Sequence, residues 1–308
     1  MPSNFDPSAL RDHVANGTLP EARLLDMYRR YYGIVPADVA IDFFVFQAAG
    51  YRIAGQVWVP SQPRGTWVLL HGYYDHMGLY GHLIRWALAQ DFAVIACDLP
   101  GHGLSGGEPA SIGDFGHYHD TLSGLLGEAD RLNLPAPWHL CGQSTGAAIV
   151  VDHLLRGKVR REIGRSVLLA PLVRPRAWVR SHLSYRALSP FLRHLPRRFT
   201  VNSTDQSFID FVHTQDPLQA KVLPSAWVGA LARWIPQIES SAPSQHRPIV
   251  VQGDADLTVD WRYNLKVLEQ KFDSPQTLLI QGARHHLANE RAETRQQYLR
   301  FLEAHLKG

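Results

Sequence analysis

The chain has 308 residues, of which 45% are hydrophobic and 19% are charged, and its formal net charge at pH 7 is +3. This composition is typical of a globular protein with a full core, and the length suffices for one large α/β domain or one domain with a sizeable insertion. So small a net charge argues against a nucleic-acid partner. The N-terminus has no signal-peptide pattern and no apolar stretch approaches the ~20 residues that span a bilayer, so we expect a cytoplasmic protein without a transmembrane segment.

The first predicted elements are one helix and one hairpin. A leading helix is expected at about residues 20–33, because apolar residues recur there at helical spacing and Gly33 follows as a stop. Residues 41–60 contain two β-type runs on either side of Ala48-Ala49-Gly50, the pattern of a hairpin.

Strands and helices alternate over most of the remaining chain. Strands are predicted at 66–72, 92–98, 137–143, 165–171, 247–253 and 276–282, and helices near 79–90, 115–132, 145–155, 263–271 and 290–306. Short, nearly continuous apolar strands separated by helices indicate a mostly parallel sheet that is covered on both faces.

The alternation stops between Pro171 and His246, where the sequence predicts helices and turns. We therefore expect an α/β core in two parts, residues 1–171 and 246–308, interrupted by a helical cap or lid at residues 172–245. These residues, 172–245, are called the insertion below.

Two serines lie in a G-x-S-x-G string, and only one has the expected surroundings of a nucleophile. Ser144, in Gly142-Gln143-Ser144-Thr145-Gly146, follows a predicted strand and opens a predicted helix that begins with small residues. This is the strand-turn-helix pattern of a nucleophile elbow, in which flanking glycines avoid collisions with the neighbouring strand and helix. Ser105 is followed by Gly, Glu and Pro instead, which is typical of a loop.

The stretch Gly101-His102-Gly103-Leu104-Ser105-Gly106 also matches the G-x-G-x-x-G pattern of dinucleotide-binding proteins. Such a site needs a helix that opens at the third glycine, and here Gly107, Glu108 and Pro109 intervene. We therefore expect no dinucleotide cofactor.

A serine nucleophile of this kind needs an acid and a histidine after later strands, in the order Ser, acid, His. Asp254, Asp256 and Asp260 follow the predicted strand at 247–253, and His285 and His286 follow the strand at 276–282. The three parts in this order, each after a strand, predict an α/β-hydrolase fold with an eight-stranded, mostly parallel sheet.

The motifs also resemble those of the serine hydrolase family that includes monoacylglycerol lipases and bacterial lysophospholipases. The similar segments are 71–76, 98–105, 142–146, 253–256 and 284–290. Gln143 departs from the family, in which His is commoner before the serine. The resemblance covers roughly residues 40–170 and 246–306, and not the leading helix or the insertion.

The resemblance implies a role for each matched residue. Ser144 attacks an acyl carbonyl, His285 removes its proton and later activates water, and Asp256 orients His285. The family pattern places the acid three residues after Gly253, at Asp256, and Asp254 is the competitor. The N–H groups of Tyr73 and Thr145 are expected to form the oxyanion hole.

The other histidines are expected to be structural, with His286 pointing away from the site and His71 and His102 bracing their loops. His117 and His119 lie two residues apart in a helical run, where side chains diverge. No second group of ligands has the spacing of a metal site. We therefore predict no metal and no cofactor.

The insertion carries the only sequence information on the substrate. Residues 171–200 contain seven arginines and no acidic residue, interleaved with Trp178, Tyr185 and Phe191. The insertion is then either a small structural cap with solvated arginines, or a lid that offers an apolar groove to an acyl chain and basic residues to a lipid or micelle interface.

The expected function is hydrolysis of small-molecule, single-chain acyl esters of the monoacylglycerol or lysophospholipid type. The alternatives within enzymes are a small-ester esterase and an acyl thioesterase. Epoxide hydrolases and dehalogenases of this fold use an aspartate nucleophile, which position 144 lacks. In a different class, the chain is a catalytically silent hydrolase scaffold that serves as a binding module.

Overall fold

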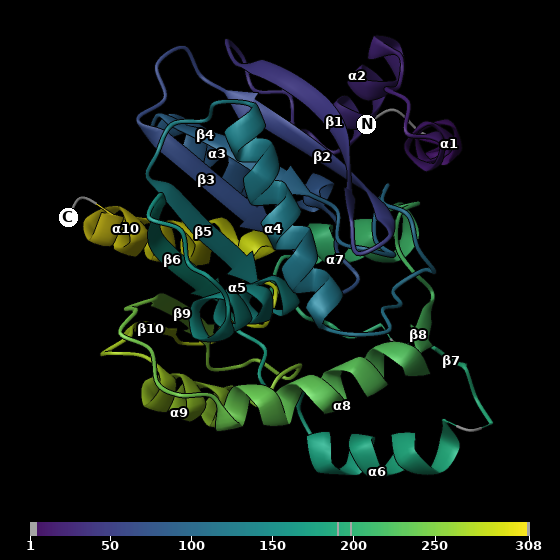
Figure 1. Ribbon diagram of the computed structural model, residues 1–308, viewed down its shortest axis with the longest axis vertical. Coiled ribbons are helices and arrows are strands. Elements are labelled where there is room, and N and C mark those ends of the chain that lie inside the picture. Colours follow the sequence, from purple (N-terminus) through teal and green to yellow (C-terminus); the bar gives the residue numbers. More distant parts are fainter. Residues whose placement is uncertain (1–4, 190, 198, 307–308) are drawn as a thin grey trace.

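The computed structural model describes residues 5–189, 191–197 and 199–306. Eight strands form one twisted sheet in the order β1-β2-β4-β3-β5-β6-β9-β10, with helices on both faces (Figure 1). Its strands are β1 (Ala40–Ala48), β2 (Tyr51–Val59), β3 (Gly65–Leu70), β4 (Phe92–Cys97), β5 (Trp138–Gln143), β6 (Ile163–Leu169), β9 (Ile249–Gly253) and β10 (Gln276–Ile280). β1 and β2 run antiparallel to their neighbours and the other pairs are parallel, which confirms the predicted α/β-hydrolase fold.

Two groups of helices cover the two faces of the sheet. Along β3, Val68 and Leu70 face one cluster of buried residues, whereas Trp67 and Leu69 face the other. The first cluster includes residues of α4 (Gly116–Arg131), α5 (Thr145–Arg156), α8 (Ser225–Ser240) and α9 (Trp261–Lys271). The second includes residues of α3 (Gly81–Ala89) and α10 (Ala292–Leu306). The inner strands β3, β4, β5 and β9 are buried at every position, as expected for a sheet covered on both faces.

The N-terminal segment contains two helices where one was expected. α1 (Ser8–Asn16) precedes α2 (Ala22–Tyr31), and both pack beside β1 and β2 at one end of the molecule (Figure 1). α1 buries only Leu10 and Val14, and Gly17 ends it with φ 69°. Two apolar residues four positions apart are too weak a periodic pattern to predict a helix by themselves.

The predicted hairpin is confirmed. Ala48 pairs with Tyr51, so the turn consists of Ala49 and Gly50 alone, with φ values of 48° and 82°. Two positive φ values in a two-residue turn match the right-handed twist of the flanking strands.

The insertion leaves the sheet after β6 and returns to it at β9. It contains α6 (Trp178–Leu188), β7 (His194–Pro196), α7 (Gln206–Thr214), β8 (Val222–Pro224) and α8. The antiparallel pair β7-β8 corrects the expectation of helices and turns alone. Strands of three residues are too short to produce an alternating pattern in the sequence.

The helices of the insertion are buried to very different degrees. On α8, Trp227, Leu231 and Trp234 are buried, and the Trp234 ring stacks on Phe115 with 4.2 Å between centroids. On α6, Val179 and Leu183 are 66% and 60% exposed. α6 lies along the outer side of α8 at the edge of the molecule (Figure 1). Within the described residues, no helix is both long and apolar enough to cross a membrane.

Candidate active site

Ser144 lies in a sharp turn between β5 and α5. Its backbone has φ 54° and ψ −111°, a conformation that a residue with a side chain adopts only under strain. A Cβ on Gly142 would lie 2.2 Å from the carbonyl carbon of Gly146, and one on Gly146 would lie 2.3 Å from the Leu70 carbonyl oxygen. Glycine is therefore required at both positions, as predicted for an elbow at Ser144.

Ser105 has no such geometry. Its hydroxyl accepts a hydrogen bond from the Ala54 N–H at 2.9 Å and donates one to the Asp98 carbonyl at 2.6 Å. The residues that follow it, through Asp114, form no helix or strand in the structure as described, so the glycine-rich stretch at 101–106 also lacks the helix that a dinucleotide site needs. Ser105 fastens this loop to β2.

Ser144, His285 and Asp256 are brought together by the ends of three parallel strands. The Nε2 of His285 lies 2.9 Å from the Ser144 Oγ, and its Nδ1 lies 2.7 Å from Oδ2 of Asp256. Ser144 follows β5, Asp256 follows β9 and His285 follows β10. All three are buried, so their hydrogen bonds are shielded from solvent.

Of the three candidate acids, only Asp256 contacts His285. Its Oδ1 accepts the N–H groups of Thr258 and Val259 at 2.8 and 3.1 Å, which leaves Oδ2 to face the ring. The competitor Asp254 accepts the Gly282 N–H at 2.7 Å and so braces the turn after β10. Asp260 caps the N-terminus of α9.

The charge pairing shifts the pKa values of His285 and Asp256 in opposite directions. Burial opposes the charged form of both groups, but the facing carboxylate raises the pKa of His285 above its ordinary value. The His285 ring, together with the hydrogen bonds to Thr258 and Gln252, lowers the pKa of Asp256. An ionised carboxylate beside the ring stabilises the imidazolium that forms when His285 accepts a proton.

Tyr73 and Thr145, whose N–H groups are expected to form the oxyanion hole, line the cavity together with Ser144. Thr145 is the first residue of α5, so its N–H is one of those without a partner inside the helix. Tyr73 lies in the loop after β3, in a turn closed by a 3.1 Å hydrogen bond from the Asp75 N–H to the Gly72 carbonyl. A Cβ on Gly72 would lie 3.4 Å from the Ser144 Cβ, so this loop passes directly against the serine.

His71 and His102 brace loops, as predicted. The Nε2 of His71 accepts the Leu99 N–H at 2.8 Å, and its Nδ1 lies 2.7 Å from the Gly72 carbonyl oxygen. The Nδ1 of His102 lies 2.8 Å from the Pro100 carbonyl oxygen. Burial lowers the pKa of both rings, to about 3 for His71 and about 4 for His102, which keeps them neutral.

Asp75, His286 and Tyr80 form a second polar group beside Ser144, which was not predicted from the sequence. Oδ2 of Asp75 lies 3.1 Å from Nε2 of His286 and accepts the Tyr80 hydroxyl at 2.8 Å. Tyr80 in turn accepts the Gly72 N–H at 2.9 Å. The expectation that His286 points away from the site is therefore wrong, because its ring and Asp75 both line the cavity. Nothing in the sequence pairs positions 75 and 286.

Gln143, which departs from the family pattern, contacts the loop after β10 that carries His285 and His286. Its Oε1 accepts the Ala288 N–H at 2.9 Å. The insertion contacts the same loop, because the Asn202 carbonyl accepts the His286 N–H at 2.7 Å. Both contacts act on residues within three positions of His285.

A cavity of about 730 Å³ opens above Ser144 and His285 between the sheet and the insertion. The apolar side chains that line it include Leu172, Leu195, Phe208, Val212, Leu223, Trp227 and Val259. Its polar lining includes Tyr74, Asp75, Arg197, Thr200, Asn202 and His213. The cavity thus combines apolar side chains with several polar groups beside Ser144.

The arginines of residues 171–200 do not all face solvent. Arg174 forms a two-point ion pair with Glu239 at 2.6 and 2.8 Å, and Arg197 lines the cavity. The exposed ones are Arg176, Arg180, Arg186 and Arg193. Arg198 lies outside the described residues.

The family model described as serine aminopeptidase, S33, matches residues 61–292, more than half of the chain. The monoglyceride lipase of Homo sapiens is 28% identical over 259 residues, which are 80% of this chain and 84% of that protein. The monoacylglycerol lipase of Mycolicibacterium smegmatis is 37% identical over 102 residues, which are 33% of this chain and 36% of that protein. Among solved structures, a soluble variant of monoglyceride lipase from Saccharomyces cerevisiae has a TM-score of 0.74 over 89% of this chain and 96% of that chain, at 15% identity, which shows a common fold.

Proposed function

This chain belongs to the serine aminopeptidase S33 family and is a serine ester hydrolase of the monoacylglycerol lipase type, and on that premise we propose that it cleaves single-chain acyl esters through Ser144, His285 and Asp256. The observation that carries the proposal is the unbroken line of contacts from the Ser144 Oγ to His285 at 2.9 Å and on to Asp256 at 2.7 Å. The same contacts speak against a catalytically silent binding module.

The first half of the reaction is transfer of the acyl group to the enzyme. His285 accepts the proton of Ser144 while Oγ attacks the carbonyl carbon of the ester, and Asp256 stabilises the resulting imidazolium. The carbonyl oxygen becomes an oxyanion, which accepts hydrogen bonds from the N–H groups of Tyr73 and Thr145. His285 then donates its proton to the departing alcohol, and an acyl-Ser144 intermediate is left.

The second half returns the enzyme to its starting state. His285 accepts a proton from water, and the hydroxide oxygen attacks the acyl carbon in the same cavity. Collapse of the second tetrahedral intermediate releases the carboxylic acid, and the proton on His285 returns to Ser144. No metal or cofactor takes part in these steps.

We propose that the insertion is a cap that binds the acyl chain. The cavity is lined by Leu195 of β7, Val212 of α7 and Leu223 of β8. Leu172, at the border of the insertion, and Val259, in the core, complete this apolar lining. Each buried CH₂ contributes about 0.8 kcal/mol, so apolar walls favour longer chains until the cavity is full.

A lipid or micelle surface is the proposed source of the substrate. α6 combines exposed Val179 and Leu183 with exposed Arg180 and Arg186, and Phe191 beyond it is 83% exposed. Apolar side chains beside arginines suit the boundary between lipid head groups and acyl chains.

The function is tested by hydrolysis of p-nitrophenyl esters and of glycerol, lysophospholipid and thioester substrates across a series of acyl lengths. We expect kcat/KM to rise with acyl length and then to level or fall. Leu223→Trp should move that optimum to shorter chains, whereas the control Leu19→Trp, at an exposed position between α1 and α2, should leave it in place. A flat dependence on length would instead favour a small-ester esterase, and a preference for thioesters would favour a thioesterase.

A further inference from the structure

A buried ion pair joins the loop after β3 to the insertion. The Nε2 of His76, three residues after Tyr73, lies 3.0 Å from Oδ2 of Asp216, just beyond α7, and both side chains have no exposed surface. Burial opposes the charge on each, yet the pairing raises the pKa of His76 and lowers that of Asp216. Removing one member of such a pair leaves the other buried and uncompensated.

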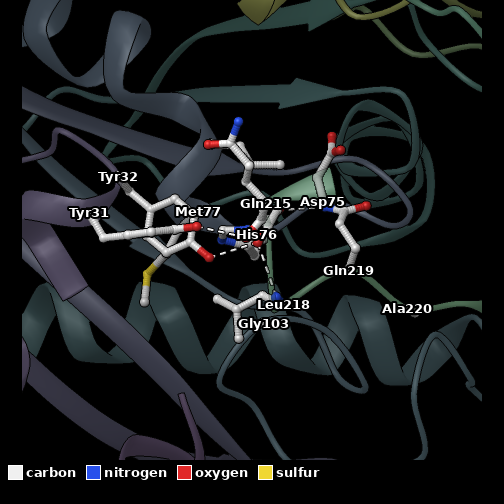
Figure 2. A network of polar contacts seen from close by, with 12 residues as sticks. Tyr31, Tyr32, Asp75, His76, Met77, Gly103, Gln215, Leu218, Gln219 and Ala220 are labelled. Carbon is white, nitrogen blue, oxygen red and sulfur yellow. Dashed lines mark hydrogen bonds and ion pairs between the residues drawn. The ribbon is translucent and has the colours of Figure 1, made fainter. Parts of the chain in front are cut away.

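Further hydrogen bonds hold the Asp216 carboxylate in place. Tyr32, at the end of α2, donates its hydroxyl to Oδ1 at 2.7 Å, and Gln219 donates its amide to Oδ2 at 2.8 Å. Figure 2 shows His76 between Tyr31 and Tyr32 on one side and the segment Gln215–Ala220 on the other. Asp216 is thus bound to two distant parts of the chain, at His76 and Tyr32, and to Gln219 in its own segment.

Arg197, at the end of β7, continues this network to Tyr74. Its Nη1 donates to Oε1 of Gln219 at 2.6 Å, and its guanidinium lies 3.9 Å from the centre of the Tyr74 ring. Gln219 therefore connects Arg197 to Asp216. A planar guanidinium stacked on an aromatic ring fixes the orientation of that ring.

α8 is a third element of the insertion that contacts this loop. The Tyr73 ring stacks on Trp227 of α8, with 3.9 Å between centroids and 19° between planes. The Tyr73 hydroxyl donates to the Ala110 carbonyl at 2.7 Å. Parts of the insertion that are distant in sequence thus contact three of the four residues from Tyr73 to His76.

The loop needs such support because its own backbone is strained. Tyr74 has φ 70°, which a residue with a bulky side chain rarely adopts, and residues 71–76 lie outside any helix or strand. A strained conformation persists only when its surroundings hold it. The contacts to the insertion are among those that hold this conformation.

We propose that the insertion acts as a clamp on this loop, and that Asp216 and Gln219 are positioning residues for the Tyr73 N–H in the oxyanion hole. The proposal rests on the proposed function, since it assumes that Tyr73 binds the oxyanion. It extends that function by giving the insertion a part in the chemical step in addition to covering the cavity.

The test compares an acyl ester with its thiono analogue, in which sulfur replaces the carbonyl oxygen. Sulfur is a poor hydrogen-bond acceptor, so a formed oxyanion hole favours the ester, and a displaced N–H weakens that preference. We expect Asp216→Asn to lower kcat/KM for the ester roughly tenfold to a hundredfold, as for a small misplacement in an active site. The ester-to-thiono ratio should fall by roughly tenfold, because one oxyanion donor is worth about 10²–10³ in kcat. Gln219→Met, which keeps the His76–Asp216 pair, should lower the ratio less.

The ester-to-thiono ratio distinguishes a displaced Tyr73 N–H from a loss of folded protein. A smaller folded fraction lowers the rates on both substrates equally and leaves their ratio unchanged. Asp210→Asn removes an exposed charge from α7 without touching the network, and its ratio should remain within about twofold of wild type. If Asp216→Asn does not fold, Gln219→Met and Tyr32→Phe decide the matter. Unchanged ratios in the folded variants would overturn the clamp alone, whereas a wild-type protein that hydrolyses neither substrate would overturn the proposed function and the clamp with it.

Discussion

The Nδ1 of His285 and Oδ2 of Asp256 lie 2.7 Å apart at the ends of β10 and β9, two neighbouring parallel strands. Asp254, two residues from Asp256, contacts the Gly282 N–H instead. The register of the β9-β10 pair and the turn after Gly253 therefore decide which of two nearby carboxylates meets the histidine.

Replacing the orienting acid should separate these two aspartates. Asp256→Asn is expected to lower kcat by roughly 10³–10⁴, since the amide no longer stabilises the imidazolium. Asp254→Asn should retain most activity and lose a little thermal stability, because it weakens only the bond to Gly282. Steady-state kinetics and Tm of both variants check this, and the reverse order of activities would assign the acid to Asp254.

The pH dependence of kcat/KM should reflect the raised pKa of His285. The ring accepts the Ser144 proton only when it is neutral, so activity should be low in acid and rise with pH. Because Asp256 raises the pKa of His285, the midpoint of that rise is expected above the ordinary imidazole value of about 6.5. The residual activity of Asp256→Asn should have its midpoint at lower pH. A wild-type midpoint well below 6.5 would contradict the assignment.

The two serines in G-x-S-x-G strings should respond differently to substitution. Ser144→Ala is expected to lower the kcat of ester hydrolysis by several orders of magnitude, because no nucleophile remains. Ser105→Ala removes the hydrogen bonds to Ala54 and Asp98, so it should cost stability but leave most activity. A fluorophosphonate probe followed by mass spectrometry should label Ser144, and labelling that depends on Ser105 would count against the elbow assignment.

Salt should weaken activity at an anionic surface more than activity in solution. We expect the exposed arginines of the insertion to attract anionic vesicles, and such an attraction is screened within about 8 Å at physiological ionic strength. We expect hydrolysis of vesicle-bound substrate to fall along a salt series while hydrolysis of p-nitrophenyl butyrate hardly changes. Changing Arg176, Arg180, Arg186 and Arg193 to Gln should remove the difference. Equal salt responses of the two substrates in the unmodified protein would argue against a lipid interface.

The fold could be predicted because its signals are local. Apolar strands, intervening helices and the glycines around Ser144 each arise from neighbouring residues, and the C-terminal ends of parallel strands meet at one edge of the sheet. That geometry is why Ser144, Asp256 and His285, predicted from their order in the chain, lie within hydrogen-bonding distance.

The contacts of the insertion could not be predicted, because they join residues that no sequence pattern relates. Asp216 reaches His76 across 140 positions, and Arg197 and Trp227 reach neighbouring tyrosines of the same loop. The sequence by itself therefore determined the sheet, the order of the three proposed catalytic residues and the family. Only the tertiary structure decided which polar side chains are buried together, since a buried charge is stabilised by whichever partners the packing of distant elements brings to it.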